Sequence, residues 1–201
     1  MQQWPAPSTI ISLAMSEANT LNAALLVTCA RIVLVVPFVA CFYLPGPWGI
    51  WGAGSIFVIA GISDALDGWI ARRLNMVTEL GAILDPVADK VMHAAALIML
   101  AADGRVPALA AAVLIARDFL VGGLRQMEEG RGALAVSPVA KAKTALQFLA
   151  LSTILLAPAI ATAEWLITAG LGLLWSSVAL SIWSGSLYTL RFVRALNSDR
   201  T

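Results

Sequence analysis

The sequence predicts an all-α integral membrane protein, with six transmembrane helices around a polar cavity that opens to the cytoplasm. Its 201 residues are 60% hydrophobic and 12% charged, whereas about a quarter of the residues of a soluble domain are charged. Uncharged runs recur along the chain, and each is long enough to cross a bilayer, at about 20 residues or more. The formal net charge is only +1, so we expect no nucleic-acid partner.

The first part of the chain predicts a surface segment followed by two spans. Residues 1–20 form an N-terminal segment, in which residues 8–18 are expected to lie on the membrane surface as a short helix. A long uncharged stretch follows, and Pro45-Gly46-Pro47 interrupts it with a turn signal. We therefore expect two helices, at residues 22–44 and 48–73.

The rest of the chain predicts four further spans. The third helix should end near the polar turn Asp103-Gly104, and the sixth contains an uncharged run from Trp165 to Leu190. The four expected helices cover residues 82–102, 106–126, 139–163 and 165–192. Residues 21–201 are thus expected to form a single transmembrane domain.

Basic residues predict the orientation of these spans. They flank the connections that follow the second and fourth helices, and they follow the sixth: Arg72, Arg73, Lys90, Arg125, Arg131, Lys141, Lys143, Arg191, Arg194 and Arg200. The other side has only Arg105. Because cytoplasmic loops carry an excess of Lys and Arg, both termini should be cytoplasmic. The polar residues of the spans then gather in the cytoplasmic half, which predicts a cavity open to that side.

Four carboxylates fall inside these apolar spans. The run that contains them is Asp64-x2-Asp67-Gly68-x2-Ala71-Arg72-x8-Gly81-x3-Asp85-x3-Asp89. The first two are three positions apart on one helix and the last two are four apart on the next, so each pair shares a helix face. Divalent cations would remove the repulsion between carboxylates so placed. Oxygen ligands favour Mg²⁺ or Mn²⁺, and two such ions could hold a diphosphate.

The small residues of this run agree with a ligand site. Gly68 and Ala71 leave room for a bulky ligand beside the helix, and Gly81 allows close approach of the backbone. Arg72 has a planar fork of donors that suits phosphate. The alternative is a structural network of ion pairs with neighbouring cations, but pairing alone would not require the small residues.

The run from Asp64 to Asp89 resembles, at each of its eight defining positions, the motif of the CDP-alcohol phosphatidyltransferase family, and the six-span topology is similar as well. The resemblance implies two Mg²⁺ or Mn²⁺ ions, bound by Asp64, Asp67, Asp85 and Asp89. It implies a CDP-linked lipid whose diphosphate lies on these metals. The residues implied to bind its CDP and diphosphate are Asp67, Gly68, Ala71, Arg72 and Gly81. It also implies that Asp89 deprotonates the acceptor alcohol, and that the protein is a homodimer in a bacterial inner membrane with its active site facing the cytoplasm.

Three further segments resemble the members of this family whose acceptor is sn-glycerol 3-phosphate. They are Thr28-x2-Arg31, the run from Ala116 to Arg125, and Ser137-x3-Lys141-x-Lys143-Thr144-x2-Gln147. The resemblance implies transfer of the phosphatidyl group from CDP-diacylglycerol to that acceptor, which gives phosphatidylglycerophosphate and CMP. The acceptor carries a phosphate, and the residues implied to bind it are Arg117, Arg125, Lys141, Lys143, Arg31 and Thr28.

Other interpretations stay open at this point. Asp118 could simply pair with a cation across helices, Lys141 and Lys143 could be anchors for anionic lipid, and His93 could be a packed histidine. A sister transferase, of the cardiolipin synthase type, would use another acceptor. A divalent-cation transporter would also need an acidic site, but transporter sites lie near the bilayer midplane, whereas these carboxylates are expected toward the cytoplasmic end.

Overall fold

The computed structural model describes most of the chain after its N-terminal segment. The described ranges are residues 30–74, 79–128, 138–160 and 164–198. Within them, the backbone alone is described at residues 67–74, 79–89, 125–128, 138, 191 and 193–198. The expected surface helix at residues 8–18 and the first part of the expected helix at 22–44 lie outside the described residues.

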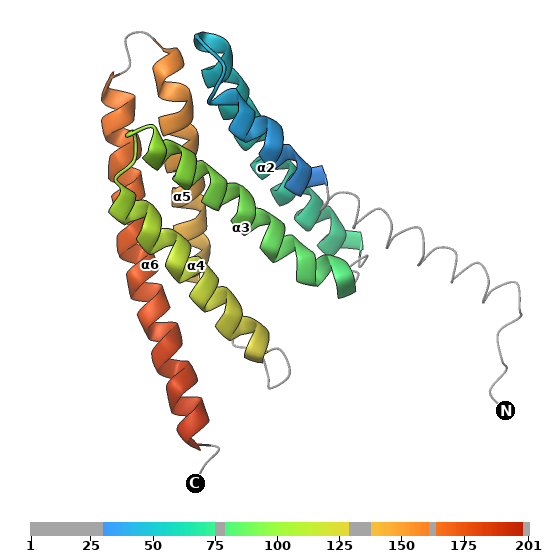
Figure 1. Ribbon diagram of the computed structural model, residues 1–201. Helices are drawn as coiled ribbons and strands as arrows, with labels where there is room; N and C mark the ends of the chain where they lie inside the picture. The colour runs from blue at the N-terminus through green and yellow to red at the C-terminus, as the bar shows by residue number, and fades with distance from the viewer. Residues whose placement is uncertain (1–29, 75–78, 129–137, 161–163, 199–201) are drawn as a thin grey trace, which may run out of the picture.

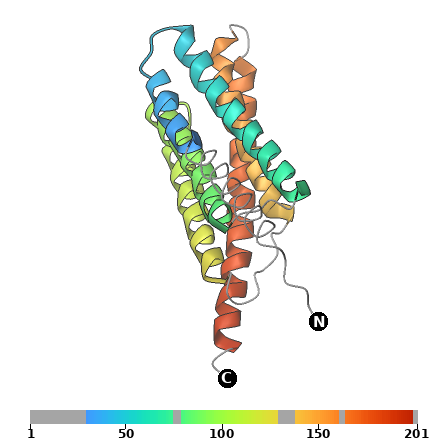
Figure 2. The same cartoon turned by 90° about the vertical axis from the view of Figure 1, so that its right-hand side faces the viewer.

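Every regular element in the described ranges is a helix. The first helix covers Ala30–Cys41. The others are α2 (Pro47–Leu74), α3 (Glu79–Ala102), α4 (Ala108–Glu128), α5 (Pro138–Leu156), the short 3₁₀ helix η1 (Ala157–Ala159) and α6 (Glu164–Ser198). Figures 1 and 2 show the long helices side by side in a bundle, from which the C-terminal part of α6 extends. The prediction of an all-α protein is confirmed for the described part of the chain.

The helix bounds agree with those expected from the sequence except at a few helix ends. The turns before α2 and after α3 each contain a glycine in the left-handed region, Gly46 with φ 75° and Gly104 with φ 71°, a conformation that glycine adopts without steric cost. The fifth helix ends at Leu156 rather than at residue 163, because Pro158 lies in the 3₁₀ turn that follows. The sixth continues to Ser198 rather than stopping at residue 192, since no Gly or Pro interrupts it there.

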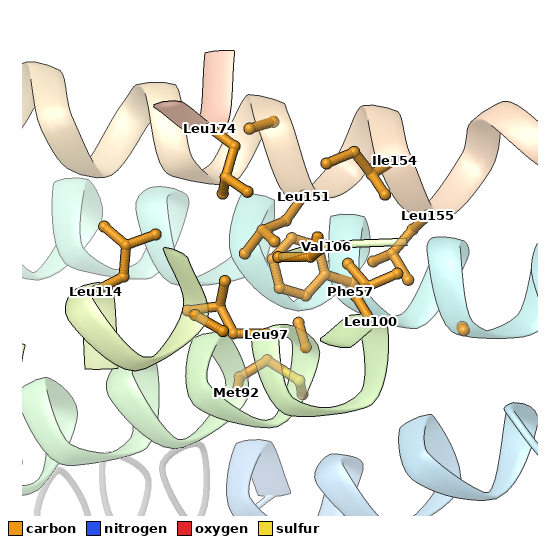
Figure 3. Packing of buried hydrophobic residues seen from close by; sticks show 14 of the residues in the cluster. Phe57, Met92, Leu97, Leu100, Val106, Leu114, Leu151, Ile154, Leu155 and Leu174 are labelled. Carbon is orange, nitrogen blue, oxygen red and sulfur yellow. The ribbon is translucent and has the colours of Figure 1, made fainter. Parts of the chain in front are cut away.

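The core lies where α2 to α6 and the first helix meet. Figure 3 shows its large members, which include Phe57, Leu97, Leu100, Leu114, Leu151 and Leu174. Lipid tails are as apolar as leucine, so close packing rather than hydrophobicity holds membrane helices together. Glycines provide that closeness here: Gly54 faces Leu156, Gly61 faces Phe148, and Gly170 faces Ile154, with no room for a Cβ at any of them.

The outer faces of the bundle are apolar. Large hydrophobic side chains such as Val36, Leu109 and Trp165 are about 70% exposed, which a protein in water would avoid on this scale. Within the described residues, three segments are long and apolar enough to cross a membrane: Pro47–Leu66, Val139–Ala159 and Glu164–Leu190. Ala30–Cys41 and Lys90–Ala102 are shorter apolar helices. These features are those of a membrane protein.

Candidate functional site

The acidic motif spans the end of α2 and the beginning of α3. Asp64 and Asp67 lie in α2, Asp85 and Asp89 lie in α3, and both helices are continuous through these positions. The two spacings therefore place each pair on one helix face, and α2 and α3 contact each other. The side chains of residues 67–89 lie outside the described part, so the meeting of all four carboxylates at one point stays a prediction.

Asp64 is the member of the motif whose side chain the structure describes. Its Oδ1 lies 2.7 Å from Nη1 of Arg31, which comes from the first helix and is only 6% exposed. A buried guanidinium needs a countercharge, and Asp64 supplies one while its own side chain remains 36% exposed. The structure thus joins a residue expected to bind the acceptor to one expected to bind metal. Thr28, which is expected near Arg31, lies outside the described residues.

A small cavity adjoins this ion pair. Its volume is about 10 Å³, which is room for about one water molecule. It is lined by Arg31, Phe57, Ala60, Gly61, Asp64, Met92, His93 and Phe148. His93 packs edge-on against Phe57, with ring centroids 5.5 Å apart, so the interpretation as a packed histidine fits the structure.

A second polar cluster joins α4 and α5. Asp118 of α4 accepts hydrogen bonds from Nζ of Lys143 at 2.6 Å and 2.8 Å, one to each carboxylate oxygen. Arg117 Nη1 also donates to Asp118, at 3.3 Å. Lys143 is only 2% exposed. Its charge-assisted hydrogen bonds to Asp118 therefore compensate for the hydration that the ammonium group loses on burial. The expectation that Asp118 could pair with a cation across helices is confirmed.

Helix α6 completes the surroundings of Arg117. Nε of Arg117 donates to the backbone carbonyl of Ser181 at 3.1 Å, and Nη2 donates to Oγ of Ser184 at 2.6 Å. The aliphatic part of Arg117 lies against Gly185, where a Cβ would crowd it. Sequence reasoning missed these serines. The spacing of Ser177, Ser181 and Ser184 could have indicated them, because positions i, i+4 and i+7 share one helix face.

The structure brings together only part of the expected set of acceptor-binding cations. Arg117 and Lys143 meet at Asp118. Lys141 is exposed, because it lies two positions from Lys143 and so faces another side of α5. The backbone of Arg125 belongs to α4, but its side chain lies outside the described residues.

The donor set of the acidic motif fits divalent metal ions. Carboxylate oxygens on two contacting helices suit Mg²⁺ or Mn²⁺ better than softer metals. The side chain of Asp64 remains about one-third exposed beside Arg31. Another cavity, with a volume of about 270 Å³, lies at the other end of α2 and α3. It is lined there by residues that include Gly46, Asp103 and Arg105.

Comparison with known proteins agrees with this arrangement. The family profile described as CDP-alcohol phosphatidyltransferase matches residues 21–183. A protein of Escherichia coli strain K12, named CDP-diacylglycerol–glycerol-3-phosphate 3-phosphatidyltransferase, is 38% identical over 183 residues, which cover 89% of this chain and 96% of that protein. An Arabidopsis thaliana protein, named CDP-diacylglycerol–glycerol-3-phosphate 3-phosphatidyltransferase 2, is 39% identical over 207 residues, which cover 96% of this chain and 86% of that protein.

The match covers the acidic motif, Arg31 and the cluster around Asp118 together. The resemblance noted in the sequence is therefore confirmed, and the chain belongs to the CDP-alcohol phosphatidyltransferase family.

Proposed function

We propose that this protein transfers the phosphatidyl group of CDP-diacylglycerol to sn-glycerol 3-phosphate, which yields phosphatidylglycerophosphate and CMP. The relatives named for this reaction, about 38% identical over most of the chain, support it. The structural observation that carries the proposal is the largely buried cluster of Arg117 and Lys143 around Asp118, in which Arg117 and Asp118 are 15% and 19% exposed. An acceptor with a phosphate needs such cations, whereas a neutral alcohol does not.

The membrane arrangement follows from the same features. We propose six spans, with both termini in the cytoplasm and a polar cavity that opens to that side. The protein is proposed to be a homodimer in the inner membrane of a bacterium. The clustering of basic residues at one end of the spans supports this orientation. The acidic motif also lies at that end, because α2 ends and α3 begins there.

The acidic motif is proposed to bind two Mg²⁺ or Mn²⁺ ions through Asp64, Asp67, Asp85 and Asp89. When bound, these ions would offset the charge of the diphosphate and of the departing CMP. Gly68, Ala71 and Gly81 would leave space for the nucleotide, and Arg72 would bind the diphosphate.

Asp89 is proposed as the base of the reaction. It takes the proton from the 1-hydroxyl of sn-glycerol 3-phosphate, and the oxygen attacks the phosphorus that carries diacylglycerol. The bond from that phosphorus to the bridging oxygen breaks, CMP leaves with this oxygen, and Asp89 passes its proton to water. A positioned base typically contributes ~10²–10⁴-fold, so binding and orientation of both substrates must supply much of the remaining rate.

Arg117 is well placed to bind the phosphate of the acceptor. A guanidinium has five N–H donors. In the described region three of its bonds are directed to Ser181, Ser184 and Asp118. These bonds fix the orientation of the side chain and leave two donors for a phosphate. Lys143 adds a second positive charge, Arg31 lies beside Asp64, and Arg125, Lys141 and Thr28 complete the proposed set.

The first prediction concerns metal and acceptor. Purified protein that is supplied with CDP-diacylglycerol and labelled sn-glycerol 3-phosphate should release CMP and form labelled lipid when Mg²⁺ or Mn²⁺ is present. A chelator should reduce both to background, and added metal should restore them, because the diphosphate charge would otherwise stay uncompensated. The measurement is CMP release and lipid label in the same samples.

The other outcomes of this assay identify the alternatives. CMP release with phosphatidylglycerol, and none with sn-glycerol 3-phosphate, would keep the family and replace the acceptor by that of a cardiolipin synthase. Absence of CMP release with every alcohol, together with metal flux into liposomes, would favour a divalent-cation transporter.

The second prediction concerns Arg117. Arg117→Gln should raise the KM for sn-glycerol 3-phosphate by about tenfold or more, since a hydrogen bond to a charged group contributes about 1.5–3 kcal/mol. The KM for CDP-diacylglycerol should change little. Lys141→Gln is the matched control, because Lys141 is an exposed cation in the same region, and it should raise the KM for the acceptor less. Equal effects of the two variants would contradict the placement of the acceptor at Arg117.

A further inference from the structure

Gln147 of α5 is buried to an unusual degree for an amide. It is 1% exposed, and neither its Nε2 nor its Oε1 has a hydrogen-bond partner among the residues that the structure describes. Buried polar groups are almost always paired, so each exception requires an explanation. A leucine or methionine would fill the same volume without losing hydrogen bonds to water. A ligand that pairs with the amide would explain why glutamine is present.

The position of Gln147 indicates which ligand. It lies four residues after Lys143, so both belong to one face of α5, about 6 Å apart along the helix axis. Lys143 is bonded to Asp118, which is also bonded to Arg117. Ser181, whose carbonyl accepts a bond from Arg117, has a buried hydroxyl that lacks a partner in the described region. Unused hydrogen-bonding groups thus lie beside the proposed phosphate-binding cations.

We propose that Gln147 is a specificity-determining residue that binds the 2-hydroxyl of sn-glycerol 3-phosphate. The inference rests on the proposed function. A hydroxyl both donates and accepts, and a primary amide offers two donors and one acceptor, so the two groups are complementary. A phosphate would be a poorer partner, because the amide oxygen cannot donate to it. The phosphate is assigned to Arg117 and Lys143 and the 1-hydroxyl to Asp89, so the 2-hydroxyl is the remaining polar group of the acceptor.

The test compares two acceptors that differ only in this hydroxyl. The probes are sn-glycerol 3-phosphate and 3-hydroxypropyl phosphate, which keeps the phosphate and the reacting primary alcohol. The wild-type protein should prefer sn-glycerol 3-phosphate by at least tenfold in kcat/KM, because a site that pairs with a hydroxyl discriminates against the analogue without it. Gln147→Met, which keeps the volume and removes the amide, should reduce this preference to nearly one. The decrease in kcat/KM should occur with sn-glycerol 3-phosphate and not with 3-hydroxypropyl phosphate.

The ratio of the two acceptors separates binding from folding. A merely structural role of Gln147 would lower both kcat/KM values together and leave the ratio at its wild-type value. Ser152→Ala is the matched control, because the Ser152 hydroxyl is another buried atom of α5 without a partner in the described region. Ser152 lies five positions after Gln147 and thus on a different face of the helix. The ratio of the two kcat/KM values in Ser152→Ala should therefore remain that of the wild type. If Gln147→Met does not fold, Gln147→Asn serves in its place. Its side chain is shorter by one methylene, so it should also reduce the preference for sn-glycerol 3-phosphate.

The results that overturn the inference differ from those that overturn the function. A wild-type protein that uses both acceptors equally well, or a Gln147→Met variant that keeps the full preference, would refute the role of Gln147 while the reaction stands. A wild-type protein that makes no lipid from sn-glycerol 3-phosphate, but releases CMP with another alcohol, would refute the proposed function itself.

Discussion

Asp89→Asn should reduce kcat by about 10²–10⁴-fold, the usual contribution of a general base. Asparagine keeps the size of the side chain but cannot accept the proton of the 1-hydroxyl. The rate of CMP formation at saturating CDP-diacylglycerol and sn-glycerol 3-phosphate measures this effect. Because Asp89 is also proposed to bind metal, the variant must in addition be tested for metal-dependent binding of CDP-diacylglycerol.

Binding measurements separate the two roles of Asp89. Asp85→Asn should lose metal-dependent binding of CDP-diacylglycerol as well as turnover, since Asp85 is proposed to bind metal only. Asp89→Asn should retain a larger part of that binding and still fail to turn over. Asp103→Asn is the control, because Asp103 pairs with Arg105 after the end of α3, far along that helix from Asp89. An Asp89→Asn variant with turnover near that of Asp103→Asn would exclude Asp89 as the base.

The sequence predicts the helices of the described part of the chain well, because the signals for them are long. A span of about 20 apolar residues and a proline–glycine turn each leave few alternatives, and α2 begins and ends within one residue of its predicted bounds. The ends that were wrong depend on weaker signals. At α5 a single proline changes the last turn to a 3₁₀ helix, and at α6 helical propensity continues past the apolar run.

The candidate site is only partly predictable for a physical reason. The spacing of Asp64 and Asp67, and that of Asp85 and Asp89, places each pair on one helix face, so this part of the site is predictable from local geometry. Partners from distant segments do not follow from spacing. The bond between Arg117 and Ser184 joins residues 67 positions apart, and the burial of Gln147 depends on how α5 packs against its neighbours. Lys141 and Lys143 are equivalent in the sequence, yet only Lys143 faces Asp118.

Asp118→Leu should strongly destabilise the protein, by about 3–5 kcal/mol, the usual cost of removing one member of a buried ion pair. The substitution takes away the carboxylate that accepts two hydrogen bonds from Lys143, whose side chain is only 3% exposed. At about 2–4 °C per kcal/mol for a chain of this size, the loss corresponds to roughly 6 °C or more in melting temperature. The measurement is thermal unfolding of the purified protein in detergent.

A double-mutant cycle shows whether the loss of stability arises from the interaction between Asp118 and Lys143. Lys143→Met added to Asp118→Leu should recover much of the stability, because two apolar side chains of similar size often replace a buried pair at little cost. Lys141→Met, which removes an exposed charge from the same helix, should change the melting temperature little and should not rescue Asp118→Leu. Neutral hydrogen bonds between membrane helices are worth only about 0.6 kcal/mol on average. A coupling energy near that value would mean that Asp118 does not act as the countercharge of Lys143, whereas a coupling of several kcal/mol would establish that it holds this cation in place.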